Sequence, residues 1–316
     1  MTRWTLEQMP GQTGRTVLVT GATSGLGLAS AIALAAAGAH VLLTARDRER
    51  GKAALTRVQR EGGPGAELIE LDLADLGSVR EAAADVRART GDTLHVLMNN
   101  AGVMGTPPRF TVDGFELQIG TNHLGHAALT WLLMPALRGA GSAERPARVV
   151  TLSSLAHRGG GLDVEDLHFT RRRYLASTAY SASKLANLLF AAELDRRLRD
   201  ADGTTPAVIS VAAHPGLTDT DLLGNSMRLR SRLLGVLSGP ANKLVTQPVR
   251  TGMLPQLYAA TAPQVRGGDY IGPGLLGETR GHPAPARRSR AAEDVELARR
   301  LWERTAAATS VQPDPR

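Results

Sequence analysis

The chain has 316 residues, enough for one large α/β domain, and 42% of them are hydrophobic, which allows a sizeable core. It contains no cysteine, which excludes disulfides, thiolate metal ligands and thiol catalysis. The net charge of +7 comes from arginines spread along the chain without interleaved aromatics, so we expect no nucleic-acid partner.

The N-terminal region raises the question of a membrane segment. Residues 1–12 contain charged side chains and no apolar run, so we expect no signal peptide and no membrane anchor. Residues 16–45 contain no Asp, Glu, Lys or Arg, and this uncharged stretch is long enough for a membrane span. Glycines interrupt this stretch, however, and a buried strand, a turn and a buried helix explain it better. We therefore expect a cytoplasmic protein.

Short apolar runs alternate with longer stretches of helical periodicity along the chain. The apolar runs predict strands at residues 16–20, 40–44, 67–71, 94–98, 148–152, 207–213 and 270–271. The longer stretches predict helices at residues 25–37, 48–61, 76–89, 115–137, 178–199 and 248–260, the fourth with a bend near Pro135. This alternation predicts an α/β fold with a single doubly wound parallel sheet of the Rossmann type and helices on both faces.

The rhythm of strands and helices is unbroken, so we expect one domain over residues 1–278. Residues 221–247 mix apolar and basic side chains and are expected to form a lid over a pocket. Such a lid would favour an apolar substrate, although ordinary packing of a short helix explains its leucines equally well.

The last 38 residues, 279–316, are expected to form a basic tail and a helix packed on or near the domain. Residues 279–290 are rich in Arg and Pro and are predicted to be irregular, and residues 291–307 are predicted to be an amphipathic helix. The apolar side of this helix carries Leu297, Leu301 and Trp302. Either the domain itself or a partner subunit of a homo-oligomer must cover it.

A glycine-rich turn joins the first predicted strand to the first predicted helix, which is the context of a dinucleotide site. Gly21 permits a tight turn, Gly25 lets the backbone approach a pyrophosphate, and Gly27 lets the helix pack on the strand. The N–H groups at the start of the helix favour phosphate. The residues expected to contact the cofactor here are Gly21, Thr23, Ser24, Gly25, Leu26 and Gly27.

The second predicted strand ends at Ala45-Arg46, where an NAD enzyme usually places an acidic residue for the ribose 2′-hydroxyl. A guanidinium can instead bind a 2′-phosphate, so Arg46 predicts NADP(H) as the cofactor. Two alternatives remain: Arg46 is a solvated surface residue like its neighbours Arg48 and Arg50, or Asp47 holds it.

Polar and small residues also follow the third and fourth predicted strands. Asp72 and Leu73 are placed to meet the adenine end of the cofactor. The turn from Asn99 to Gly102, which includes Ala101, lets the cofactor pass closely.

Tyr180 and Lys184 are four residues apart in a predicted helix and therefore share one face of it. A phenol titrates near pH 10, too high for a base at neutral pH. A nearby lysine cation stabilises the phenolate and is expected to lower the pKa of Tyr180. The pair therefore predicts Tyr180 as a proton-transfer residue and Lys184 as its activator.

In this order the motifs resemble the short-chain dehydrogenase/reductase family, over roughly residues 15–274. The resemblance implies that Asn122 and Ser154 join Tyr180 and Lys184 as catalytic residues. It also implies that the loop from Pro215 onward holds the nicotinamide carboxamide. The cofactor contacts implied in that loop are Pro215, Gly216, Leu217 and Thr220.

The strings Ser153–His157 and Tyr180–Asn187 are most similar to the retinol dehydrogenase and protochlorophyllide reductase branch of that family. The spacing from Ser154 to Tyr180 is longer than in the family's shortest members. We therefore expect an extra loop between Gly159 and Ala176 at the mouth of the pocket.

The resemblance implies hydride transfer between NADP(H) and a small-molecule carbonyl or alcohol, with Tyr180 as general acid and base. It implies that Ser154 binds the substrate oxygen and that Asn122 anchors a water linking Lys184 to solvent. Two alternatives are an NADP(H)-binding sensor without turnover and a C=C reductase that uses the same residues. His123, His126 and His214 have no carboxylate at ligand spacing, so we expect no metal site.

Overall fold

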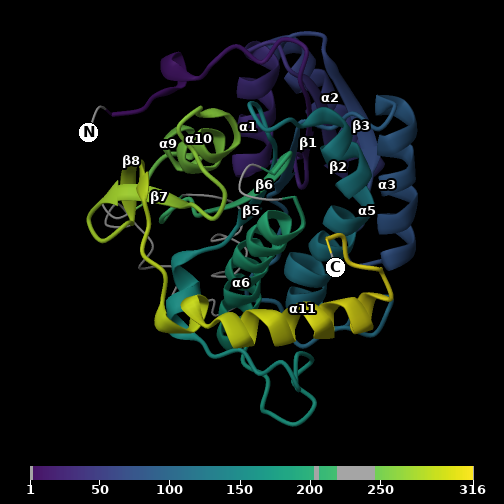
Figure 1. The fold of residues 1–316 in the computed structure, drawn as a ribbon, viewed down its shortest axis with the longest axis vertical. Coiled ribbons are helices and arrows are strands. Elements are labelled where there is room, and N and C mark those ends of the chain that lie inside the picture. Colours follow the sequence, from purple (N-terminus) through teal and green to yellow (C-terminus); the bar gives the residue numbers. More distant parts are fainter. Residues whose placement is uncertain (1–2, 203–205, 219–245, 316) are drawn as a thin grey trace.

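The structure is a computed structural model that describes residues 3–202, 206–218 and 246–315 (Figure 1). The described residues form one eight-stranded sheet with the order β3-β2-β1-β4-β5-β6-β7-β8. The strands are β1 (Thr16–Val19), β2 (His40–Ala45), β3 (Ala66–Glu70), β4 (Val96–Asn99), β5 (Ala147–Leu152), β6 (Val208–Ala213), β7 (Tyr270–Leu275) and β8 (Arg280–Pro285). Strands β1 to β7 pair in parallel, and the predicted doubly wound sheet is confirmed.

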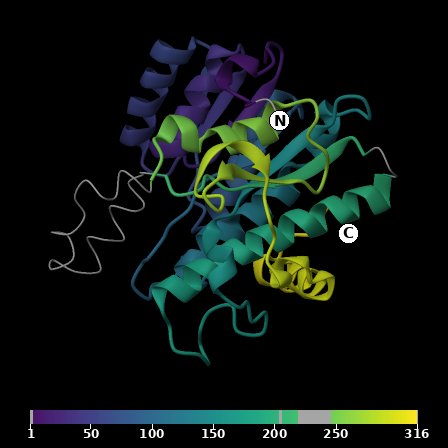
Figure 2. The ribbon, with the colours of Figure 1, turned by 90° about the vertical axis from the view of Figure 1, so that its left-hand side faces the viewer.

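Helices cover both faces of the sheet, as predicted (Figures 1 and 2). One face carries α1 (Gly25–Ala36), α2 (Arg48–Gly62), α9 (Val249–Gly252) and α10 (Leu254–Thr261). The other face carries α3 (Leu76–Thr90), α5 (Gly125–Ala140) and α6 (Ala176–Asp202), and α11 (Val295–Thr309) packs on the outside of α6.

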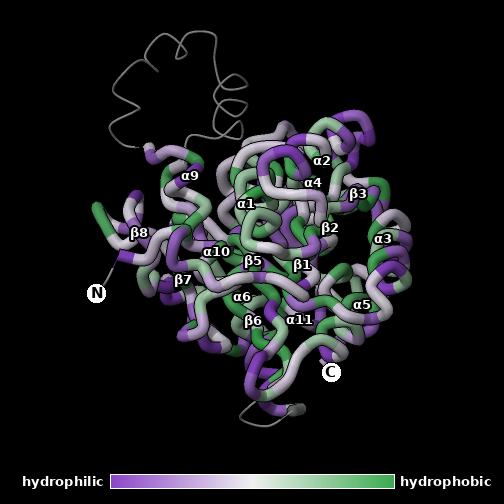
Figure 3. The backbone as a smooth tube through the Cα atoms, turned by 90° about the horizontal axis from the view of Figure 1, so that it is seen from above, coloured by the Kyte–Doolittle hydropathy of each residue, from purple (hydrophilic) through white to green (hydrophobic). Residues whose placement is uncertain are grey.

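The core lies in two layers, one on each side of the sheet, because successive strand residues point to opposite faces. In β1, Val17 and Val19 pack in one layer with Leu34 of α1, while Leu18 packs in the other layer with Leu129 of α5. All of these side chains are fully buried. Burial on both faces explains why the central strands are continuous apolar runs, and Figure 3 shows hydrophobic segments gathered along them.

The helix predicted over residues 115–137 is a continuous series of three segments. It begins as α4 (Leu117–Ile119), continues through a π-helical turn, η2 (Gly120–Leu124), and ends as α5, which contains Pro135. The irregular hydrogen bonding therefore lies at η2, and η2 carries Asn122. Turns of this kind inside helices frequently occur at functional sites.

Three short 3-10 turns were not predicted: η1 (Leu6–Gln8), η3 (Leu155–Gly159) and η5 (Arg290–Glu293). The loop expected between Gly159 and Ala176 is present, and it connects η3 to α6. Its Tyr174 hydroxyl donates to the Thr106 carbonyl oxygen over 2.9 Å. Within the described part of the chain, no residue of this loop between η3 and α6 lines the pocket at the carboxyl ends of the central strands, which is described below.

The prediction that residues 279–290 are irregular is wrong for half of that segment. Residues 280–285 form β8, which pairs antiparallel with β7, so the sheet is not purely parallel and the boundary expected at residue 278 falls inside a hairpin. Pro283 and Pro285 fit this strand because β8 is at the edge of the sheet, where a missing N–H donor is tolerated.

Helix α11 lies across α6 (Figure 1). The apolar side of α11, which carries Leu301 and Trp302, is therefore covered by the domain itself and not by a partner subunit. Most of the lid expected at residues 221–247 lies outside the described residues. Among the helices that the structure describes, none combines the length and the apolar character needed to cross a membrane.

Candidate active site

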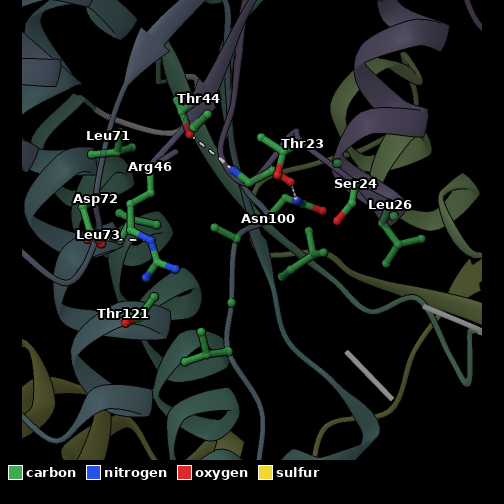
Figure 4. A pocket seen from close by; sticks show the side chains of 18 of the residues that line it. Thr23, Ser24, Leu26, Thr44, Arg46, Leu71, Asp72, Leu73, Asn100 and Thr121 are labelled. Atoms are coloured by element: carbon green, nitrogen blue, oxygen red, sulfur yellow. Dashed lines mark hydrogen bonds and ion pairs between the residues drawn. The ribbon is translucent and has the colours of Figure 1, made fainter. Parts of the chain in front are cut away.

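A pocket of about 430 Å³ lies at the carboxyl ends of the central strands, where open α/β sheets bind ligands (Figure 4). Fourteen residues predicted to bind the cofactor line it: Gly21, Thr23, Ser24, Gly25, Leu26, Gly27, Arg46, Asp72, Leu73, Ala101, Gly102, Tyr180, Lys184 and Pro215. Asn100, which belongs to the turn predicted to let the cofactor pass closely, also lines it. Further lining residues were not predicted to contact a cofactor: Thr44, Ala45, Asp47, Arg50, Leu71, Val103, Thr121, Leu152 and Ser153.

The glycine turn between β1 and α1 needs glycine at three positions for two different reasons. Gly21 and Gly25 have φ angles of 65° and 54°, which side chains rarely adopt. A Cβ atom at Gly27 would clash with the Gly21 carbonyl oxygen and the Asn100 amide. The turn therefore leaves the N-terminus of α1 open to the pocket, as a phosphate site requires.

Thr20 joins the turn after β1 to the turn after β4. Its Oγ1 accepts hydrogen bonds from the backbone N–H groups of Asn100 (2.9 Å) and Ala101 (3.0 Å). The Asn100 side chain donates back to the Thr20 carbonyl oxygen over 2.7 Å. Sequence reasoning gave Thr20 no role, because the contact joins residues 80 positions apart.

Asn99 and Asn100 have different roles. Asn99 is buried, and its Nδ2 donates to the Thr130 hydroxyl over 3.0 Å, so its side chain packs inside the fold. Asn100 lines the pocket instead. The cofactor contact predicted for Asn99 therefore cannot come from its side chain in this geometry.

Arg46 lies beside Asp72 and Leu73 at the edge of the pocket (Figure 4). Its side chain is 72% exposed, and its Nε is 4.0 Å from the Asp72 carboxylate, a distance at which an exposed ion pair contributes little. Asp47 does not hold Arg46 but caps α2 by accepting from the Arg50 N–H over 2.9 Å. Among the described residues the Arg46 guanidinium is therefore held only weakly and can bind an anion, and Arg50 lines the same part of the pocket.

Tyr180 and Lys184 line the other end of the pocket, and Ser154 lies next to Tyr180 without being one of the lining residues of the described segments. Tyr180 and Lys184 project from α6, with the Lys184 ammonium 5.7 Å from the centre of the Tyr180 ring. The Lys184 ammonium also donates to the Leu152 carbonyl oxygen over 3.2 Å. Ser154 begins η3 as its N-cap, and its hydroxyl hydrogen-bonds Tyr180. Ser153, which was not assigned a role, donates to the Lys184 carbonyl oxygen over 2.8 Å.

The pKa of Tyr180 differs from the sequence-based expectation. Burial raises its pKa, and the hydrogen bond with Ser154 opposes this by less. Burial also lowers the pKa of Lys184 to about 8. The prediction that Lys184 lowers the pKa of Tyr180 rested on the lysine charge alone. Removal of the phenol from water acts in the opposite direction and is the larger effect. The phenol is therefore held in its protonated form.

Asn122 is buried in the π-helical turn and pairs with a backbone segment of the pocket. Its Oδ1 accepts from the Val103 N–H over 2.7 Å, and its Nδ2 donates to the Val103 carbonyl oxygen over 2.9 Å. Its own carbonyl oxygen accepts from His126 Nδ1 over 3.0 Å. A Cβ at Gly102 would lie 3.1 Å from Asn122 Oδ1 and 3.5 Å from Lys184 Nζ, so the Asn122 and Lys184 side chains both lie next to Gly102.

Lys184→Met is expected to stabilise the fold at pH 7, and this gain should shrink as the pH rises from about 8 toward 10. Burial places the pKa of Lys184 at about 8 in the folded state, whereas an unfolded lysine titrates near 10.4. Between these values the unfolded chain binds more protons than the folded chain, so wild-type stability rises with pH. The melting temperatures of both proteins, measured from pH 7 to pH 10, check this.

Lys52→Met is the matched control, because Lys52 is exposed on α2 and pairs with Glu49. A melting-temperature difference between Lys184→Met and wild type that stays constant over the whole pH range would contradict the prediction.

The loop after β6 reaches the pocket through Pro215. Gly216 follows with a φ of 66°, and its N–H donates to His214 Nδ1 over 3.2 Å. Leu217 N–H donates to the Thr279 carbonyl oxygen over 2.8 Å. Neither Gly216 nor Leu217 is among the lining residues within the described segments. Thr220 lies outside the described residues.

Comparison with known proteins gives the same family as the motifs of this chain. The family model described as short chain dehydrogenase matches residues 15–230. Polyprenol dehydrogenase from Mus musculus is 42% identical over 300 residues, covering 93% of this chain and 83% of that protein. Retinol dehydrogenase 13 from Homo sapiens is 39% identical over 294 residues, covering 93% and 84%. These relatives confirm the similarity to the retinol dehydrogenase branch.

Among solved structures, the crystal structure of an uncharacterized protein from Mycobacterium paratuberculosis is 40% identical to this chain. It superposes with a TM-score of 0.79, covering 98% of this chain and 99% of that chain. The similarity therefore extends over the tail hairpin and α11 as well as the sheet.

Proposed function

The chain belongs to the short-chain dehydrogenase family, and from that premise we propose that it transfers hydride between NADP(H) and a carbonyl or alcohol, with Tyr180 as general acid and base. The observation that carries this proposal is that Tyr180 and Lys184 line the same pocket as the glycine turn. NADPH consumption across ketones, aldehydes and enones, with identification of the products, tests it. Binding without consumption would favour a sensor, and saturated products from enones would favour a C=C reductase.

The residues present fit a dinucleotide. The turn at Gly21, Gly25 and Gly27 excludes side chains where a pyrophosphate would approach the start of α1. Arg46 and Arg50 place two cations at the end of the pocket next to β2, where an adenine ribose is bound in this fold. This pair supports a 2′-phosphate and therefore NADP(H).

The bound cofactor would supply or accept the hydride. Ser154 and Tyr180 hydroxyls would bind the substrate oxygen, which orients the carbonyl carbon for transfer. Because burial keeps the Tyr180 phenol protonated, the resting protein is prepared to donate a proton to the oxygen of a carbonyl being reduced. In the oxidation direction the Lys184 cation would stabilise the Tyr180 phenolate as it takes the alcohol proton.

We propose an apolar alcohol or carbonyl compound as the substrate class. Polyprenol and retinol, in the names of the two similar dehydrogenases, are both apolar alcohols. A series of aldehydes of increasing chain length, assayed with NADPH, tests this. Catalytic efficiency should rise with chain length, and a preference for short polar aldehydes would contradict the proposal.

Arg46→Ala is expected to weaken NADPH binding by about 10- to 100-fold, since a charged contact to phosphate contributes about 1.5–3 kcal/mol. NADH lacks the 2′-phosphate, so its affinity should change little. Dissociation constants for both cofactors check the prediction.

Arg48→Ala is the matched control. Arg48 is as exposed as Arg46, but it pairs with Glu70 over 3.1 Å and, among the described residues, is not part of the pocket lining. If Arg46→Ala weakens NADPH and NADH equally, or wild type prefers NADH, the assignment of Arg46 is wrong.

A further inference from the structure

A polar cluster lies beside the catalytic end of the pocket and has no role in the chemistry above. It consists of Glu278, Arg158, His214 and His157, here called the Glu278 cluster. Glu278 lies on the turn between β7 and β8, and its side chain is only 14% exposed. Its Oε2 accepts from the Arg158 guanidinium over 2.6 Å and from His214 Nε2 over 3.2 Å. In the described part of the chain, none of the four residues lines the pocket.

One arm of the Glu278 cluster fixes the loop that carries Pro215. An ionised carboxylate only accepts hydrogen bonds, so His214 must carry a proton on Nε2. Burial lowers the pKa of His214 to about 4, so the ring is neutral and its Nδ1 is unprotonated. Nδ1 is then the acceptor for the Gly216 N–H. Glu278 therefore selects the His214 tautomer that holds the loop after Pro215.

The other arm fixes the segment that carries Ser154. Arg158 belongs to η3, which Ser154 caps by accepting from the Ala156 N–H over 3.2 Å. His157 Nδ1 donates to the Ser154 carbonyl oxygen over 2.7 Å. The Tyr270 ring contacts both histidines, with centroids 5.8 Å from His157 and 5.3 Å from His214. The two segments are therefore joined through one carboxylate and one ring.

We propose that Glu278 is a positioning residue that sets Ser154 and Pro215 relative to each other across the catalytic end of the pocket. The inference rests on the proposed function, because it concerns where the nicotinamide and the substrate oxygen would be held. It concerns only that end: Arg46 and the glycine turn make no contact with Glu278 among the interactions that the described residues show.

Glu278→Ala tests the proposal on the full-length protein. We expect kcat to fall by about 10- to 100-fold, because small misplacements of reacting groups lower the rate by this amount. NADPH should bind more weakly, while 2′,5′-ADP, which lacks the nicotinamide, should bind as in wild type. Glu278→Gln keeps an acceptor oxygen for Arg158 and His214 and should recover most of the activity.

Glu165→Ala is the matched control. Glu165, in the loop between η3 and α6, also bridges two arginines, Arg300 and Arg304 of α11, and among the described residues it does not line the pocket. It should leave kcat and both affinities unchanged.

If wild type turns over NADPH and Glu278→Ala keeps its kcat, the inference alone is wrong. An equal loss of 2′,5′-ADP and NADPH binding would also overturn it, because the role of Glu278 would then be general stability. If Glu278→Ala does not fold, Glu278→Gln decides. A folded Glu278→Gln protein that loses affinity for 2′,5′-ADP as much as for NADPH would overturn the inference. Absence of NADPH turnover in wild type would overturn the proposed function itself.

Discussion

Tyr180→Phe is expected to remove most turnover while leaving the fold and the cofactor affinity nearly unchanged. The substitution deletes one hydroxyl, which is the group that would give the proton to the substrate oxygen and take it back. Loss of a positioned acid and base typically costs about 100- to 10,000-fold in kcat. The ring of Tyr180 stays in place in the variant, so its contact with the Lys184 ammonium is kept. Steady-state kinetics and NADPH titration measure the two effects separately.

Tyr174→Phe is the control for this substitution. Tyr174 also loses a hydrogen-bonded hydroxyl, the donor to the Thr106 carbonyl oxygen, but it lies outside the pocket lining of the described chain. Its turnover should stay near wild type. If Tyr180→Phe also keeps near-normal turnover, another group transfers the proton and the catalytic assignment of Tyr180 is wrong.

The first third of the fold could be predicted because local sequence marks each change of direction. In residues 16–45, an apolar run ends at a glycine, a helix follows, and Gly38 with a φ of 95° ends it. Strand β8 could not be predicted in this way. Pro283 and Pro285 argue locally against a strand, and they are tolerated only because β8 is at an edge, which is a property of the whole sheet.

The site shows the same division between local and distant information. Residues at strand ends could be assigned to one pocket because parallel strands end at the same edge of the sheet. Which of Asn99 and Asn100 faces the pocket depends on a one-residue register that the sequence does not fix. Glu278 meets His214 and Arg158 from 64 and 120 residues away, so no spacing reveals it. The pKa of Tyr180 depends on burial, which only the folded structure shows.

Trp302→Ala is expected to cause the largest loss of stability among these variants, about 3–5 kcal/mol. Trp302 is 3% exposed on α11 and stacks on Phe190 of α6 at 5.4 Å, with Trp131 of α5 at 4.9 Å. The Arg197 guanidinium lies 4.8 Å from the centre of its ring. Removing the indole leaves a cavity among three helices that cannot easily collapse. Thermal and denaturant unfolding of the variant measure the loss.

Val295→Ala is the control within the same helix, since Val295 is 62% exposed and its truncation should change stability little. Similar losses in the two variants would mean that α11 contributes through its helical propensity and not through the packing of Trp302.

At a temperature where Trp302→Ala is fully folded, its NADPH turnover should stay close to wild type. Trp302 packs against Phe190, whereas Tyr180 and Lys184 lie near the beginning of α6, where Ser153 and the Leu152 carbonyl oxygen hold Lys184 to the end of β5. A cavity beside Phe190 should therefore loosen the outer layer of the core before it moves the catalytic end of the helix. Turnover that falls while the protein remains folded would show that α11 sets the position of α6 as a whole. The tail would then belong to the catalytic apparatus as well as to the core.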